Sequence, residues 1–348
     1  RRYILRGTRR VVYAMSFPRR ERELAEHAFI GPYGILSENS LGRAAPEEEC
    51  RIRTCFQRDI DRITHSKSFR RLKHKTQVFL QPEGDHYRTR LTHTLEVSRL
   101  ARTVARALKL NEDLAEAIAL GHDLGHTPFG HAGERALNRI YPGGFKHYEQ
   151  SLRVVDILES DGRGLNLCRE TRMGILHHTH GAPDDTLEAV AVRLCDRIAY
   201  INHDLDDAIR AGILTAGDVP EAVRRRCGER NSERINAILT DLIDNSSGGE
   251  LKMSLEMKAV FDVFHSFMYS DVYTNPRAKS EESKVDGILS RLYGYYTDRP
   301  EKLPEDFRSV VENEGRERAA CDYISGMTDG YAMEKYGELF IPFAWTVK

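Results

Sequence analysis

The run GHDLGHTPFGH at residues 121–131 decides how the rest of the chain is interpreted. A helix rich in alanine and leucine, predicted over residues 111–120, leads directly into His122 and Asp123. Adjacent side chains cannot share one helix face, but both can reach one ion where a helix ends. Two glycines and a proline then interrupt regular structure. Histidines clustered at a helix end therefore indicate a metal site with catalytic groups beside it.

The bulk composition limits the class of protein. The 348 residues can bury a sizeable core in one large or two moderate domains. Contents of 40% hydrophobic and 30% charged residues are typical of a folded protein and exclude intrinsic disorder. No apolar run approaches the roughly 20 residues that span a bilayer, and no apolar segment follows the basic N-terminus, so we expect neither a membrane partner nor secretion. The six cysteines form no C-x-x-C pair, which predicts free thiols in the cytoplasm.

Charge is distributed unevenly along the chain. Residues 1–110 carry 24 lysines and arginines against 12 aspartates and glutamates, whereas the remainder carries 28 against 41. A basic N-terminal third suits a polyanionic ligand such as a nucleoside triphosphate or a nucleic acid. The alternative is that the two parts neutralise each other across the fold, and the asymmetry alone does not decide between them.

Hydrophobic periodicity predicts an all-α fold, mainly helical, with at most a small β-hairpin near residues 76–88. A charged helical pattern runs over residues 47–75, and an amphipathic helix is predicted over residues 89–110. Further helices are predicted over residues 131–140, 149–160, 167–178 and 185–211. We expect three parts: a basic helical and irregular segment (1–88) packed on the core, the core itself (89–212), and a C-terminal helical region (213–348).

Two residues distant from the first motif complete a candidate ligand set. His93 lies on the apolar stripe of its predicted helix, although an inward histidine is more often a core residue than a ligand. Asp196 lies on the inner face of the 185–211 helix, where an unpaired carboxylate is costly unless it binds a cation. Arg193 or Arg197 could supply that pairing. Two imidazoles and two carboxylates otherwise suit a divalent ion such as Mg, Mn, Fe or Zn.

The order His93, His122-Asp123, Asp196 resembles that of the HD superfamily of metal-dependent phosphohydrolases. Longer motifs within residues 32–340 are similar to those of the bacterial deoxynucleoside triphosphate triphosphohydrolases, and these motifs are specific to that family. These motifs are RTCFQRDIDRITHSKSFRRL (53–72), KTQVF (75–79), RLTHTLEV (90–97), HDLGHTPFGHAGE (122–134), HYEQSLRVV (147–155) and DYISGMTD (322–329).

The resemblance implies a reaction and a set of roles. Water attacks the α-phosphorus of a dNTP, dGTP being one candidate, and the products are deoxynucleoside and inorganic triphosphate. The implied metal ligands are His93, His122, Asp123 and Asp196. His131 is the implied general acid for the leaving 5′ oxygen, oriented by Glu134 at i,i+3 on the same helix face.

Further residues are expected around the substrate. His126 is grouped with the catalytic residues, and both it and His147 are expected to contact the triphosphate. Arg90, one turn before His93, suits an α- or β-phosphate, and Arg197 is a second phosphate candidate unless it faces solvent. The resemblance places Gln77, Val78, Tyr200 and Asp204 at the deoxyribose, with Tyr200 where a 2′-hydroxyl would sit and Asp204 at the 3′-hydroxyl.

Partners and alternatives follow from the same comparison. Relatives form homo-oligomers, and some respond to an activating dNTP at a subunit interface or to single-stranded nucleic acid. One alternative function is an HD phosphodiesterase or 5′-nucleotidase, which would not need Gln77, Arg90 or the His131–Glu134 pair. Another is a nucleic-acid-responsive regulatory protein on the same fold, favoured by the basic third. The histidines at 177, 178 and 180 are expected to be structural or to line the pocket mouth.

Overall fold

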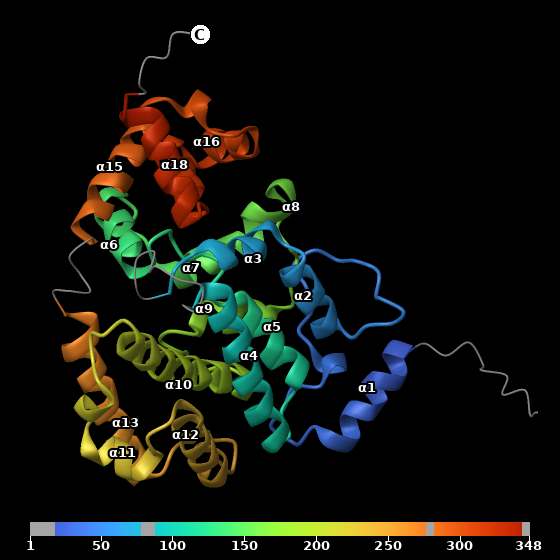
Figure 1. The fold of residues 1–348 in the computed structure, drawn as a ribbon. Helices are drawn as coiled ribbons and strands as arrows, with labels where there is room; N and C mark the ends of the chain where they lie inside the picture. Colours follow the sequence, from blue (N-terminus) through green and yellow to red (C-terminus); the bar gives the residue numbers. More distant parts are fainter. Residues whose placement is uncertain (1–17, 78–87, 276–281, 343–348) are drawn as a thin grey trace, which may run out of the picture.

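The computed structural model describes residues 18–77, 88–275 and 282–342 as a helical protein (Figure 1). The helices are α1 (Pro18–Phe29), α2 (Cys55–Thr64), α3 (Lys67–Arg71), α4 (Arg90–Ala107), α5 (Glu112–Gly121), α6 (Gly130–Ile140), α7 (His147–Arg153), α8 (Glu159–Gly162), α9 (Arg169–His177), α10 (Leu187–Arg210), α11 (Glu221–Cys227), α12 (Asn231–Asn245), α13 (Leu255–Met268), α15 (Glu282–Asp298), α16 (Arg308–Glu314), α17 (Arg316–Ser325) and α18 (Asp329–Phe340). Two π-helical turns, η3 (Val154–Leu158) and η5 (Tyr269–Tyr273), continue α7 and α13.

The all-α prediction is confirmed. The hairpin expected near residues 76–88 falls largely on 78–87, outside the described residues; at its edge an isolated antiparallel bridge pairs Thr76 with Thr89. Within the ranges that the structure describes, no helix is both long and apolar enough to cross a membrane.

Helix α5 forms the centre of the fold, packed against α2, α4, α9 and α10. Asn111 caps its N-terminus because the side-chain oxygen accepts hydrogen bonds from two backbone N–H groups of the first turn. Its apolar residues are buried from Leu114 onward, as a helix enclosed on several sides requires. At Gly121 an added Cβ would lie 2.4 Å from the side chain of Ile175, so the close approach of α9 requires glycine there.

Helices α4 and α10 flank α5 and begin at well-defined caps. Thr89 forms a capping box with Thr92 at the start of α4, and Thr186 caps α10. These caps fix where each helix begins, and therefore which residues of α4 and α10 face α5.

The charged pattern at residues 47–75 folds differently from the prediction. Residues 47–54 are not helical, because Thr54 forms a capping box with Gln57 and starts α2 at Cys55. Ser66 caps the separate helix α3. The pattern therefore contains two short helices rather than one continuous helix.

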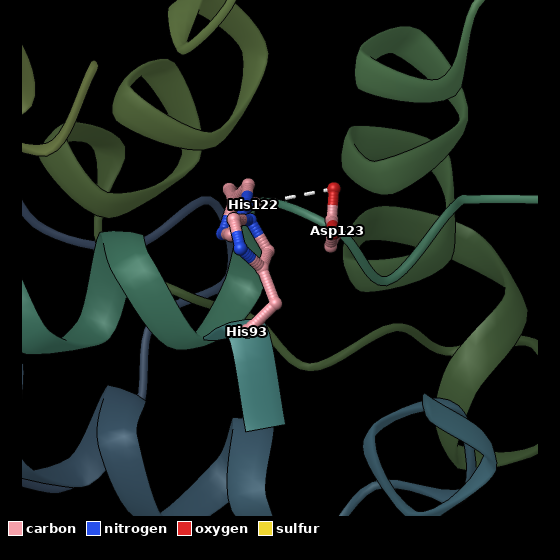
Figure 2. Close-up of side chains that lie close together, drawn as sticks. All are labelled: His93, His122 and Asp123. Carbon is pink, nitrogen blue, oxygen red and sulfur yellow. Dashed lines mark ion pairs between the residues drawn. The ribbon is translucent and has the colours of Figure 1, made fainter. Parts of the chain in front are cut away.

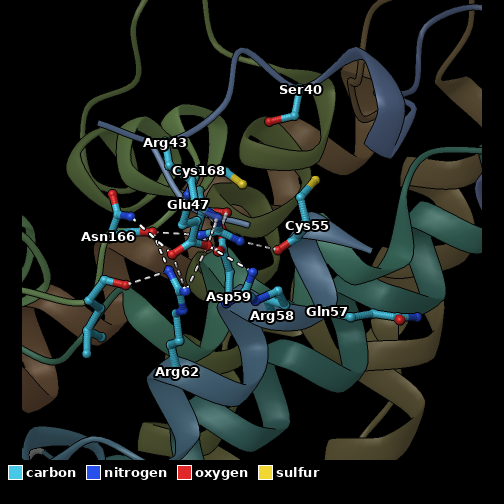
Figure 3. Close-up of polar contacts among 12 residues, drawn as sticks. Ser40, Arg43, Glu47, Cys55, Gln57, Arg58, Asp59, Arg62, Asn166 and Cys168 are labelled. Atoms are coloured by element: carbon cyan, nitrogen blue, oxygen red, sulfur yellow. Dashed lines mark hydrogen bonds and ion pairs between the residues drawn. The ribbon is translucent and has the colours of Figure 1, made fainter. Parts of the chain in front are cut away.

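Two arginines of the basic third are paired with nearby carboxylates (Figure 3). Arg43 lies 2.5 Å from the fully buried Asp59, and Arg62 lies 2.7 Å from Glu47. Both guanidinium groups also donate to the backbone carbonyl of Asn166. Carboxylates of the same chain therefore neutralise these two arginines. The carboxylates, Asp59 and Glu47, lie within the basic third itself rather than in the acidic remainder.

The C-terminal helices α15–α18 gather with α6 at one end of the molecule (Figure 1). Their shared core contains Leu137 of α6, Leu289 of α15 and Ile324 of α17. A second, larger core joins Phe56, Val97 and Leu242. Each of these three residues belongs to a different one of the predicted parts 1–88, 89–212 and 213–348. Because one core joins all three parts, it does not mark boundaries between them, and the division into three stays a prediction.

Candidate metal centre and substrate pocket

Three buried side chains meet where α4 begins and α5 ends (Figure 2). His93 comes from the first turn of α4, and His122 and Asp123 directly follow α5. Their ligand atoms all lie within 4.8 Å of one another, and the three residues are only 1–3% exposed. A group of this kind could hold a metal ion.

Asp196 of α10 approaches the same cluster from the other side. Its Oδ1 lies 3.0 Å from Nε2 of His93 and 3.7 Å from Nε2 of His122. The four residues expected to ligate a metal are therefore brought together from three helices.

The two arginines that could have paired with Asp196 lie elsewhere. Arg193 forms an ion pair with Asp185 at 2.8 Å. The exposed Arg197 places its guanidinium over the ring of Phe261, 6.0 Å from the centroid. The carboxylate of Asp196 is thus paired with histidine nitrogens rather than with arginine.

The protonation of His122 tests whether a cation fits. Its Nδ1 donates to the carbonyl oxygen of Ala119 at 2.6 Å, which fixes the proton on that nitrogen. Nε2 is buried and has no hydrogen-bond partner, and it lies 3.5 Å from Oδ1 of Asp123. A buried lone pair facing carboxylate oxygens is unfavourable without a cation among them. The arrangement therefore suits a divalent ion.

Both carboxylates are held in the ionised form that a metal ligand needs. Burial opposes ionisation of Asp123, but His122, His126 and Arg90 together hold the pKa of that carboxyl well below its usual value. Arg90 is 1% exposed, and its Nη1 lies 2.9 Å from Oδ2 of Asp123. The pKa of Asp196 is lowered to about 2, because its hydrogen bond with His93 outweighs burial.

A second group of histidines lies beside the cluster. The rings of His126 and His147 are stacked, with centroids 4.2 Å apart. Together with Asp123 they form another group whose ligand atoms lie within 4.8 Å of one another. Burial and the neighbouring charges of Arg90 and His147 hold the pKa of His126 well below its usual value, so this imidazole is neutral.

Glu134 hydrogen-bonds to His147, whereas it was expected to orient His131. Its Oε1 accepts from the backbone N–H of His147 at 3.0 Å, and its Oε2 accepts from Nδ1 of the same residue at 3.0 Å. Nδ1 of His131 lies 3.7 Å from Oε2, which is an ion-pair distance rather than a hydrogen-bond distance. The side chain of His131 is 64% exposed. His131 and Glu134 are thus neighbours at the pocket, but their contact is loose.

Residues of both histidine groups line a cavity of about 830 Å³. Its lining includes most of the residues expected at the substrate: Gln77, Arg90, His126, His131, Glu134, His147, Arg197, Tyr200 and Asp204. Val78 lies outside the described residues.

Sequence analysis missed Tyr273, which lines this pocket. Tyr273 donates its hydroxyl to Oδ2 of Asp204 at 2.6 Å, and its ring lies 6.4 Å from that of Tyr200. Burial raises the pKa of Asp204 to about 8, and its Oδ1 is buried without a partner. Since 69 residues separate Tyr273 from Asp204, no local pattern indicated this contact.

His178, one of the three histidines expected to be structural or to line the pocket mouth, is in the pocket lining and lies against His122 with ring centroids 5.0 Å apart. Its Nδ1 donates to the carbonyl of Ile175, the same three-residue contact that His122 makes at the end of α5. This shared position just after a helix is the sequence signal that could have placed His178 beside His122. Its neighbours behave as structural residues, since His177 pairs with Asp185 and His180 contacts the ring of Tyr148.

Comparisons with known proteins agree with this geometry. The family model for the HD domain matches residues 90–201, and that for the phosphohydrolase-associated domain matches residues 251–338. The chain is 53% identical over 324 residues to a deoxyguanosinetriphosphate triphosphohydrolase-like protein of Caldanaerobacter subterraneus subsp. tengcongensis, with 93% of this chain and 96% of that protein covered. Proteins of the same name from Clostridium perfringens (strain SM101) and Desulfatibacillum aliphaticivorans are 49% and 46% identical, covering 88% and 93% of this chain and 93% and 98% of theirs.

Proposed function

Because the chain belongs to the family of HD-domain deoxyguanosinetriphosphate triphosphohydrolase-like proteins, we propose that it hydrolyses a deoxynucleoside triphosphate to deoxynucleoside and inorganic triphosphate. The observation that carries the proposal is the buried His–Asp cluster at the base of a cavity, lined by the side chains that we expect to contact phosphate and sugar. We take dGTP as the first substrate to test, since the relatives are named deoxyguanosinetriphosphate triphosphohydrolase-like proteins.

The metal would be held by His93, His122, Asp123 and Asp196. When bound, a divalent cation supplies Lewis acidity, which polarises a phosphate oxygen and lowers the pKa of water. The ligand types fit Mg, Mn, Fe and Zn alike.

The triphosphate would lie against the cationic and imidazole groups that line the cavity. Arg90 is fixed by its ion pair with Asp123 and donates to the α- or β-phosphate. The neutral His126, the stacked His147 and the exposed Arg197 surround the rest of the chain of phosphates. These groups bind the substrate so that its α-phosphorus faces the cluster.

The leaving 5′ oxygen needs a proton, because an alkoxide is a poor leaving group. We assign that proton to His131, with Glu134 accepting a hydrogen bond from it once substrate is bound. His147 is a second candidate for the acid, because Glu134 already accepts its hydrogen bonds. The two histidines are therefore compared directly among the predictions below.

The sugar would lie among Gln77, Tyr200 and Asp204; Val78, which the resemblance also implies, lies outside the described residues. A ring at Tyr200 against C2′ leaves no space for a 2′-hydroxyl and so rejects ribonucleotides. Asp204, held by Tyr273, binds the 3′-hydroxyl with its free Oδ1.

Product analysis tests the proposal. Purified protein is incubated with each dNTP and with Mg²⁺ or Mn²⁺, the metal is removed with a chelator, and the products are identified by ³¹P NMR for the phosphates and by liquid chromatography for the nucleoside. The proposal predicts inorganic triphosphate and deoxynucleoside in equal amounts. Release of pyrophosphate or monophosphate would refute it, and hydrolysis of a nucleoside monophosphate or a cyclic dinucleotide instead would support the phosphodiesterase or nucleotidase alternative.

We also propose that the protein is a cytoplasmic homo-oligomer that an activating dNTP or single-stranded nucleic acid regulates. Sedimentation analysis with and without dNTP tests assembly. A steep decrease of single-strand affinity with salt would support nucleic-acid binding by the basic third, whereas absence of binding at low salt would exclude it.

A further inference from the structure

Residues 122–129, which connect α5 to α6, are called the catalytic loop below. The segment 322–329, DYISGMTD, contacts this loop although it lies some 200 residues further along the chain. It comprises the end of α17, a short connection and the first residue of α18. None of the roles proposed above uses it. Its last residue, Asp329, is buried at 3% exposure, and the preceding Thr328 is the N-cap of α18.

The carboxylate of Asp329 joins two stretches that line the pocket. Its Oδ2 accepts from the backbone N–H of Thr76 at 3.0 Å and from the hydroxyl of the same residue at 2.7 Å. Its Oδ1 accepts from the backbone N–H of Phe129 at 2.8 Å. One side chain thus ties the residue before Gln77 to the residue that begins the turn into α6.

The turn at Phe129 is conformationally demanding. Phe129 has φ 63° and ψ 25°, in the left-handed region that a residue with a Cβ seldom occupies, and Gly130 follows with φ 54°. An added Cβ at Gly130 would lie 3.2 Å from the carbonyl oxygen of Gln77 and 3.3 Å from Nη2 of Arg90. The turn is therefore pressed against the substrate side of the pocket, and it determines where the next residue, His131, projects.

A buried lysine makes a parallel tie. The ammonium of Lys75, at 2% exposure, donates to the carbonyl oxygen of Ser325 at 2.9 Å and to that of His126. The same C-terminal segment is therefore bonded to the catalytic loop at both His126 and Phe129.

We propose that Asp329 is a positioning residue for the reaction: by holding the Phe129 turn and Thr76 together, it sets the direction of His131 toward the substrate. The inference rests on the proposed function for the role of His131. An asparagine at this position cannot replace the carboxylate, because it has one acceptor oxygen for three donors and turns an N–H group toward them. Misplacement of a catalytic group by about 1 Å can cost roughly 100-fold in rate.

A double-mutant cycle tests the proposal with dGTP and Mn²⁺. Asp329→Asn is expected to lower kcat by about 10- to 100-fold, with bound metal unchanged by elemental analysis. In the His131→Ala background the same substitution is expected to change kcat less than about twofold, because the group that it positions is already gone. Additive losses in the cycle, or an unchanged kcat for Asp329→Asn alone, would overturn the proposal.

The chain offers a matched control for loss of a buried carboxylate. Asp241 accepts from the backbone N–H of Ser254 at 2.8 Å and from its hydroxyl at 2.7 Å, the same contacts that Asp329 makes with Thr76, but away from the pocket. Asp241→Asn is expected to lower the melting temperature and leave kcat unchanged. An equal loss of kcat in both variants would show a general effect of destabilisation and contradict the proposal.

Milder variants keep the test open if Asp329→Asn does not fold. Thr76→Val removes only the hydroxyl contact and is expected to lower kcat about threefold, while Thr76→Ser restores it; no loss with valine would overturn the proposal. Should triphosphate not be the product, the proposed function fails by itself, and the same cycle is measured on whichever nucleotide the protein hydrolyses with an alkoxide leaving group.

Discussion

The base of the pocket and its rim are built in different ways. At the base, His93, His122 and Asp123 are 1–3% exposed and are fixed by the central helices α4 and α5. At the rim, the side chain of His131 is 64% exposed, and Arg197, which also lines the cavity, is exposed. Helix packing therefore fixes the side chains of the base, whereas the substrate-facing side keeps side chains that have room to move onto a ligand. The predictions below separate the two regions.

The largest effect is expected at the base. Asp123→Asn should abolish tight metal binding and lower kcat by roughly 10³-fold or more, since the several kcal/mol that a bound cation contributes are lost. Metal content by elemental analysis and turnover of dGTP measure both effects. Asp241→Asn, which removes a buried carboxylate outside the pocket, serves as the control. Full metal occupancy in Asp123→Asn would contradict the assignment of the base.

At the rim, His131→Ala should leave the metal in place and lower kcat by about 10²- to 10⁴-fold, as expected when a general acid is removed. His147→Ala is the matched comparison, because His147 makes the hydrogen bonds to Glu134. If the loss of kcat is larger for His147→Ala and His131→Ala retains turnover, the proton donor is His147 and the assignment to His131 is wrong.

A smaller effect is expected in the sugar corner. Tyr200→Ala should lower the preference for dGTP over GTP by roughly tenfold, because removing a steric block relieves about 1–3 kcal/mol of discrimination. Tyr200→Phe keeps the ring and should preserve the preference. Ratios of kcat/KM for the two nucleotides measure it, and an unchanged ratio in the alanine variant would argue against a steric gate.

The last prediction concerns the pH dependence of stability rather than activity. Burial raises the pKa of Asp204 to about 8 from an ordinary value of 3.8, so the folded protein keeps a proton that the unfolded chain releases. This residue therefore makes the free energy of unfolding decrease as pH rises from about 4 to about 8, by at most about 1.4 kcal/mol per pH unit.

Asp204→Asn mimics the neutral acid and should remove this decrease. Urea unfolding of both proteins at pH 5.5 and pH 8 is the measurement, and the asparagine variant should gain stability relative to the parent at the higher pH. Parallel profiles would indicate that Asp204 is already ionised in the folded protein.

Local signals placed the residues of the base at helix ends and on inner faces, and the family resemblance implied that they are ligands. The 111–120 helix, its Asn111 cap and the motif after it place His122 and Asp123 at a helix end, and helical spacing turns His93 and Asp196 inward. The same kind of local signal failed at residues 47–54, where the capping box at Thr54 overrides a charged pattern that continues in both directions.

The support around the site was not predictable, because it depends on contacts between distant segments. Tyr273 reaches Asp204 from the end of α13, and Asp329 reaches Phe129 across 200 residues. His178 reaches His122 only because α9 packs against α5. Such contacts follow from the packing of whole helices, which no window of sequence records.

Anomalous scattering from crystals grown with Mn²⁺ tests the central claim most directly. The account predicts an anomalous peak about 2.0–2.4 Å from the ligand atoms of His93, His122, Asp123 and Asp196. A sole peak beside His126 and His147, or none near either group, would contradict it.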